Sequence, residues 1–138
     1  MNEKLTDFGD WPFCGGVLVT DSLVLTTGYC CNQVNKDMLK VVAGEHDLHA
    51  EEGPEQEAGV EEMIVHPEFD PVTFENDICL VKLVTRLELN SEVGVIRAAA
   101  PGQSFSGSGT VSGWGALEDG GVFPDELMSA EVTLRNEL

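Results

Sequence analysis

The sequence predicts an all-β fold, and three observations support this prediction. Short β-rich runs recur along the chain, separated by Gly, Pro, Asn and Asp residues. No long segment places apolar residues at helical spacing. The run 78–84 is almost continuously apolar, as expected for a strand that is buried on both faces. Such regularly spaced short strands are typical of β-barrels and β-sandwiches.

Each candidate strand is a run of three to seven residues in which β-branched and other apolar side chains dominate. The eight runs are 17–19, 23–26, 39–43, 63–65, 78–84, 95–97, 110–112 and 131–134. The Gly- and Ser-rich stretch 101–109 is expected to be a flexible connection between the sixth and seventh runs.

The length of the chain indicates one domain, and its charge excludes polyanions as good candidate partners. A chain of 138 residues is long enough for one domain with a core. Its formal net charge of -18 repels polyanions, so nucleic acid and membrane surfaces are poor candidate partners. No run approaches the roughly 18 apolar residues of a membrane span, and residues 1–5 do not resemble a signal peptide.

Four motifs in order identify a family. They are Phe13-Cys14-Gly15-Gly16, Leu25-Thr26-Thr27-Gly28-Tyr29-Cys30, Asn76-Asp77-Ile78-Cys79-Leu80 and Val111-Ser112-Gly113-Trp114-Gly115. Together they resemble the trypsin/chymotrypsin-like serine proteases, and the extra cysteines most resemble arthropod trypsins. The resemblance implies a trypsin-like Greek-key β-barrel followed by the start of a second barrel. We therefore expect an N-terminal tail at 1–10, a first barrel at 11–100, and a linker with an incomplete second barrel at 101–138.

The resemblance also predicts which part of the catalytic triad is present. Asp77 matches the triad Asp, but Tyr29 stands where the family has its catalytic His. A phenol is almost wholly protonated at neutral pH and offers one oxygen, whereas the base uses two separate nitrogens. Of the remaining histidines, His46, His49 and His66 belong to other loops, and we expect a structural role for His66.

Other parts of the protease machinery do not occur in these 138 residues. The sequence contains neither the Gly-Asp-Ser-Gly motif of the nucleophile nor the activating Ile-Val-Gly-Gly. We expect the chain to be a fragment, because a complete two-barrel protease would need about another hundred residues. Catalysis requires all these groups in place, so the chain as given is expected to be inactive.

The resemblance predicts two disulfides. In the family the positions of Cys14 and Cys30 are joined, and the enclosed loop would contribute about 3 kcal/mol. Cys31 follows the base position and Cys79 follows Asp77, so the triad geometry of the family would bring them together. A Cys31–Cys79 disulfide is expected, with two buried thiols as the alternative. An even cysteine count favours an oxidising compartment, and the family implies secretion to the extracellular space.

The segment 44–56 resembles the calcium loop of trypsins. Carried over by position, Glu45, Glu52 and Glu55 would supply carboxylates, while Asp47 and Ala50 would supply main-chain oxygens. The alternative is a solvated acidic loop without an ion.

Three functions remain open at this point. The first is an inactive trypsin-like domain that binds other proteins, for example as a decoy for protease inhibitors. The second is part of an active, secreted serine endopeptidase, and it requires an explanation for Tyr29. The third, an unrelated β-domain that binds calcium, leaves the four motifs unexplained.

Overall fold

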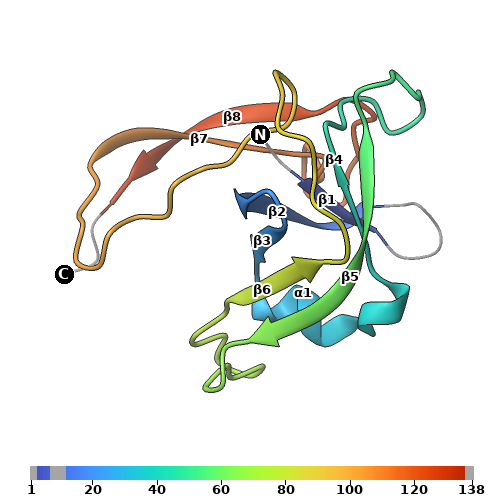
Figure 1. Ribbon diagram of the computed structural model, residues 1–138. Helices are drawn as coiled ribbons and strands as arrows, with labels where there is room; N and C mark the ends of the chain where they lie inside the picture. The colour runs from blue at the N-terminus through green and yellow to red at the C-terminus, as the bar shows by residue number, and fades with distance from the viewer. Residues whose placement is uncertain (1–2, 7–11, 136–138) are drawn as a thin grey trace.

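The computed structural model describes residues 3–6 and 12–135. Six antiparallel strands form a closed barrel in the order β1-β2-β3-β6-β5-β4, and a separate two-stranded sheet contains β7 and β8 (Figure 1). The elements are β1 Glu3–Thr6, β2 Pro12–Thr20, β3 Leu23–Thr26, α1 Gly28–Gln33, the 3-10 helix η1 Lys36–Met38, β4 Lys40–Ala43, β5 Gln56–Val65, β6 Cys79–Leu83, β7 Gly107–Gly113 and β8 Met128–Leu134. The sequence prediction of an all-β fold is confirmed.

The first four strands form a Greek key. β1, β2 and β3 pair in succession, and β4 returns to pair with the free edge of β1. β6 and β5 then close the barrel between β3 and β4. Closure of this kind removes exposed strand edges from the first half of the molecule.

The barrel interior is filled by one apolar cluster. Strands contribute alternate residues to it, because successive side chains point to opposite faces of a strand. The largest fully buried side chains among the described residues are Leu5, Leu18, Val24, Val41, Cys79, Val81 and Val93. Gly16 is needed on β2 because a Cβ there would lie 2.6 Å from Cγ1 of Val24. The close approach of β2 and β3 therefore excludes a side chain at this position.

Three details differ from the sequence prediction. Part of the expected tail 1–10 is strand β1, whose Leu5 is completely buried; residues 1–2 and 7–10 lie outside the described residues. Residues 95–97 form no strand, and Ile96 only donates one backbone hydrogen bond, to the carbonyl of Leu18 at 2.9 Å. β6 is not buried on both faces: Lys82 is exposed between buried neighbours, because the barrel strands have a solvent face.

The β7–β8 hairpin extends beside the barrel as a long arm (Figure 1). Every β8 residue from 128 to 133 is exposed, and most of β7 is exposed as well. A two-stranded ribbon of this kind is only marginally stable by itself in water. The hairpin lies within the segment 101–138, for which the start of a second barrel stays a prediction.

Candidate functional site

Asp77 and helix α1 meet at one end of the barrel. β3 leads into α1, and Asp77 precedes β6; the pairing of Thr26 with Cys79 places these two connections side by side. Oδ1 of Asp77 accepts a hydrogen bond from the backbone N of Tyr29 at 2.8 Å. The structure thus brings together the two residues that the sequence assigns to the triad, through the main chain of Tyr29.

The side chain of Tyr29 makes a different contact. Its ring packs edge to face against Phe74, with ring centroids 5.8 Å apart and an interplanar angle of 64°. Both side chains remain about half exposed, at 48% for Tyr29 and 51% for Phe74. An aromatic pair therefore stands at the position where the sequence resemblance expects the catalytic base.

The loop that carries Phe74 is closed by its own hydrogen bonds. The backbone N of Phe74 donates to the carbonyl of Asp70 at 2.8 Å, and the N of Asp70 donates to the carbonyl of Glu75 at 3.0 Å. Nδ2 of Asn76 donates to the carbonyl of Glu68 at 3.1 Å. Phe74 and Asn76 adopt left-handed backbone conformations, with φ of 58° and 54°, which residues other than glycine rarely occupy.

Asp70 stabilises the turn within this loop. Its Oδ1 accepts hydrogen bonds from the backbone N of Val72 at 2.7 Å and from that of Thr73 at 3.3 Å. These amides favour the charged carboxylate and lower the pKa of Asp70 below its ordinary value. The loop is therefore held in its fold by an ionised side chain.

Two disulfides connect α1 to both sides of the site. Cys30 is bonded to Cys14 on β2, and the neighbouring Cys31 is bonded to Cys79 on β6. Both predicted pairings are confirmed. The helix itself has only six residues, and Oγ1 of its N-cap, Thr27, accepts from the N of Cys30 at 3.2 Å. Because so short a helix is unstable alone, the disulfides and the cap hold it in place.

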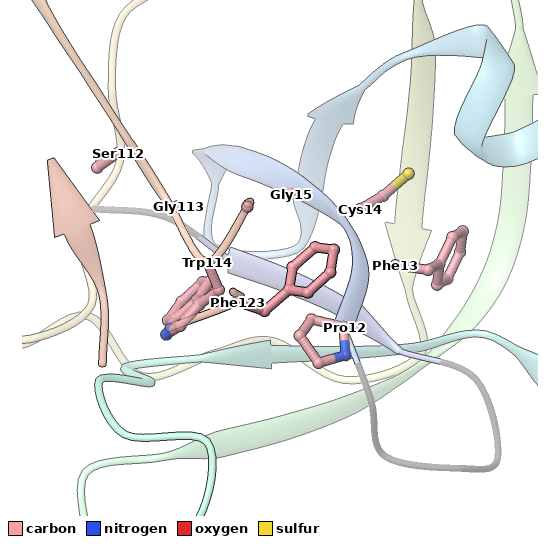
Figure 2. A pocket seen from close by; sticks show the side chains of 9 residues that line it. Pro12, Phe13, Cys14, Gly15, Ser112, Gly113, Trp114 and Phe123 are labelled. Carbon is pink, nitrogen blue, oxygen red and sulfur yellow. The ribbon is translucent and has the colours of Figure 1, made fainter. Parts of the chain in front are cut away.

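A cavity of about 280 Å³ lies between β2 and the segment that follows β7 (Figure 2). Trp114 is buried against it, and Nε1 of Trp114 donates to the carbonyl of His46 at 3.1 Å. Figure 2 shows the rings of Trp114 and Phe123 near Pro12, while Phe13 lies beyond Cys14. The lining residues are Pro12, Phe13, Cys14, Gly15, Ser112, Gly113, Trp114, Gly115 and Phe123. Because none of the described residues in this lining has an ionisable side chain, their surface suits apolar binding rather than acid–base chemistry.

The acidic loop 44–56 is organised by hydrogen bonds from its own backbone. Oε2 of Glu52 accepts from the N of Asp47 at 3.2 Å. Both carboxylate oxygens of Glu55 accept backbone N–H groups, from Glu52 at 2.6 Å and from Gly53 at 2.7 Å. The carbonyl of Asp47 accepts from the N of Ala50 at 3.2 Å. Most of the predicted calcium ligands are therefore engaged within the loop.

This loop also holds the segment that precedes β8. The carbonyl of His46 accepts from the N of Leu127 at 2.8 Å as well as from Trp114, and Nε2 of His49 lies 3.0 Å from Oδ1 of Asp125. Among the described residues, no group of three or more His, Cys, Asp or Glu side chains is arranged to hold a metal ion. The present loop conformation connects the two halves of the chain and does not by itself form a calcium cage.

The hydrogen bonds of His66 are to residues of the loop 66–78. Its Nδ1 accepts from the backbone N of Glu68 at 3.2 Å, and its own N donates to the carbonyl of Ile78 at 3.0 Å. His66 thus closes the loop 66–78 at its base, as the structural role expected from the sequence requires.

The comparison with known proteins agrees with this geometry. Residues 4–137 match the family described as Trypsin. The chain belongs to the trypsin family. It is 37% identical to Trypsin-1 of Astacus astacus over 125 residues, which cover 88% of this chain and 53% of that protein. It is 39% identical to Trypsin-4 of Rattus norvegicus over 120 residues, which cover 86% and 47%.

The chain matches only part of the length of its trypsin relatives. The chain spans about half the length of these two trypsins. A third relative, Serine proteinase stubble of Drosophila melanogaster, is 31% identical over an alignment of 154 residues, with 97% of this chain and 20% of that protein covered. Similar identities to arthropod and mammalian trypsins do not single out the arthropod subfamily. No helix in the described part of the chain is long and apolar enough to cross a membrane.

The role of Phe74 was not predicted from the sequence. Phe74 is one of two phenylalanines in the loop 66–78 and lies 45 positions from Tyr29, so nothing in the sequence connects the two residues. The Trp114–His46 hydrogen bond also went unforeseen, because it joins a side chain to a carbonyl 68 residues away.

Proposed function

We propose that this chain is a trypsin-family domain that does not cleave peptides and that acts by binding other proteins. The observation that carries the proposal is the Asp77–Tyr29 contact: the carboxylate oxygen meets a backbone amide, and the side chain at the base position packs on Phe74. Proton transfer in this family needs an imidazole between the carboxylate and the nucleophile. A phenol ring turned to a neighbouring ring does not supply it.

The test uses the gene product that carries this sequence, whatever its length. We expect no hydrolysis of lysyl or arginyl amide substrates and no labelling by a fluorophosphonate. Tyr29→Phe is the matched control and should be equally inactive. Measurable hydrolysis by the unmodified protein, above that of Tyr29→Phe, would falsify the proposal.

A second function, part of an active secreted endopeptidase, is favoured by one observation. The Cys14–Cys30 disulfide and the Asp77 hydrogen bond preserve the framework in which a base would sit. If the chain belongs to an active endopeptidase, the unmodified protein will hydrolyse lysyl or arginyl amide substrates in the same assay. The two proposals therefore give opposite results in a single experiment.

As a binding role, we propose capture of protein protease inhibitors. Support comes from the cavity beside Trp114 and the exposed aromatic pair, which leave apolar surface on the side of α1 and β2. The basic pancreatic trypsin inhibitor serves as the probe in calorimetric titration. Binding of the inhibitor to the unmodified protein, with weaker binding to Phe74→Ser, would support this role. Absence of binding at high micromolar inhibitor would contradict it.

Calcium binding by the loop 44–56 is also proposed. Glu45, Ala50 and Glu55 line one hollow together, and Oε1 of Glu45 is buried there. An ion would have to draw Glu52 and Glu55 away from the backbone amides they now accept, since calcium prefers six to eight oxygen ligands.

Thermal unfolding tests this proposal, because a ligand of the folded state raises the melting temperature. We expect a higher melting temperature in millimolar calcium than in chelator, and a smaller difference in Glu55→Gln. Glu62→Gln makes the same charge change at an exposed position of β5 that does not line this hollow. Equal melting temperatures in calcium and chelator would rule the ion out.

We propose an extracellular location on the basis of the two disulfides. Disulfides persist in oxidising compartments and are rare in the cytosol. Detection of the native protein with all four cysteines reduced would contradict this location.

A further inference from the structure

Tyr29 and Phe74 form a pair of half-exposed rings at one end of the barrel, which we call the aromatic platform. We propose that the aromatic platform binds the cationic side chain, Arg or Lys, of a protein partner. This inference rests on the proposed binding function and adds the chemistry of the partner.

The aromatic platform presents two ring surfaces to solvent. Each side chain is about half exposed, and the edge-to-face arrangement sets the rings at 64° to each other. A ring face carries partial negative charge and attracts a cation placed over it within about 6 Å. Two inclined rings can therefore contact one guanidinium or ammonium group from two sides.

The backbone under the aromatic platform is already ordered. Tyr29 is fixed by its amide hydrogen bond to Asp77, and Phe74 by its hydrogen bond to the carbonyl of Asp70. The disulfide from Cys31 to Cys79 joins the two supporting elements covalently. A surface that is ordered before binding loses little conformational entropy on association, which favours affinity.

Charge complementarity selects a cation rather than a neutral apolar group. Between residues 41 and 81 the sequence contains 12 Asp and Glu residues and no Lys or Arg. Four of these acids lie in the loop 66–78 that carries Phe74: Glu68, Asp70, Glu75 and Asp77. Their summed field would steer a positive group toward the rings.

Four of the seven Lys and Arg residues of the chain form ion pairs with carboxylates outside the loop 66–78. The pairs in the described residues are Lys36–Asp37, Lys40–Glu57, Lys82–Glu61 and Arg86–Asp21. None of these pairs includes an acid of the loop 66–78. These four cations are therefore engaged away from the aromatic platform, and the proposal assigns the cation to the partner.

The sequence itself offers a specific probe, because Tyr29 is its only tyrosine. Ring-¹³C-labelled tyrosine gives NMR signals that belong to Tyr29 without further assignment. The titrants are acetyl-Arg-Ala-Arg-amide and its uncharged isostere acetyl-Cit-Ala-Cit-amide, where Cit is citrulline. We expect the arginine peptide to shift the Tyr29 ring signals in a saturable manner and the citrulline peptide to leave them in place.

Three variants locate the interaction. Phe74→Leu keeps an apolar side chain but removes one ring, and should weaken arginine-peptide binding about two- to fivefold, the range for one exposed cation–π contact. Phe74→Tyr restores a ring and should restore affinity. Glu51→Gln removes a charge from the distant acidic loop and should change affinity less than Glu75→Gln does.

Other results overturn the inference. Equal shifts with the citrulline peptide would show that the contact is not cationic, and an unchanged affinity in folded Phe74→Leu would show that the rings are not the site. An equal effect of Glu51→Gln and Glu75→Gln would indicate a diffuse charge effect only. Hydrolytic activity with an intact arginine response would refute the proposed lack of catalysis and leave the aromatic platform standing.

Discussion

The ring of Phe69 lies directly over Gly28 at the start of helix α1. A Cβ built on Gly28 would be 3.0 Å from both Cγ and Cδ2 of Phe69. In the motif Leu-Thr-Ala-Ala-His-Cys that this segment resembles, alanine stands at the position of Gly28. The ring therefore occupies space that a methyl group at position 28 would need.

Gly28→Ala is accordingly expected to destabilise the protein by about 1 kcal/mol. Alanine favours helix by up to about 1 kcal/mol over glycine, but overpacking typically costs 1–3 kcal/mol. Urea unfolding of Gly28→Ala, Phe69→Leu and the double variant measures this balance. The double variant should be more stable than the sum of the single effects predicts; strict additivity would show that the two residues do not interact.

Tyr29→His should create a histidine with a pKa above its ordinary value. The new imidazole would stand beside the Asp77 carboxylate, which favours the protonated form. A raised folded-state pKa contributes stability below the unfolded-state pKa and loses it as pH rises through the folded value. NMR titration of the imidazole is the measurement, and Asp77→Asn in the same background should return its pKa toward the ordinary range. An identical titration in both backgrounds would contradict the geometry.

Replacing the two disulfides by alanine pairs should have unequal costs. The Cys31–Cys79 bond spans 48 residues and the Cys14–Cys30 bond spans 16. By the chain-entropy relation these loops correspond to about 4 and 3 kcal/mol. We expect Cys31→Ala/Cys79→Ala to unfold at lower denaturant than Cys14→Ala/Cys30→Ala. The reverse order would indicate that native packing, and not loop length, dominates.

Acid should loosen the loop 66–78 through Asp70. Because amides of Val72 and Thr73 lower the folded pKa of Asp70, its contribution is present above the unfolded pKa and is lost as pH falls through the folded value. In Asp70→Asn, stability should therefore depend less on pH in the acid range. Chemical denaturation at several acidic pH values provides the comparison, with Glu51→Gln as a control for charge removal alone. The same pH dependence in Asp70→Asn and the unmodified protein would be evidence against this role.

The sequence predicted most strands because their signal is local. Residues 23–26 are apolar or β-branched and follow the turn at Asp21 and Ser22, and they form β3 with the expected bounds. β1 escaped prediction because Glu3–Thr6 is short and largely polar, and it becomes a strand only through its pairing with β2 and β4. Residues 95–97 have the composition of a strand, but they form no strand although Ile96 donates a hydrogen bond to Leu18 of β2. Pairing is a tertiary property that composition does not contain.

The candidate site was predictable where a motif fixed the position of a residue. Asp77, Tyr29 and both disulfides followed from the family motifs. The contact of Phe74 with Tyr29 did not, because it depends on a left-handed turn at Phe74 for which the sequence carries no glycine signal.

Because Cys30 and Cys31 are neighbours in the sequence, the two disulfides determine whether the chain stays in one piece after the backbone is cleaved. The two disulfides leave neighbouring residues, so a covalent route runs from Cys14 through Cys30 and Cys31 to Cys79. A single cut anywhere in 15–29 or 32–78 leaves both pieces linked. Nicked molecules should therefore migrate as one band without reductant and as two with it. Where proteases are abundant, the chain can therefore be cleaved once within these segments while its two fragments stay covalently joined.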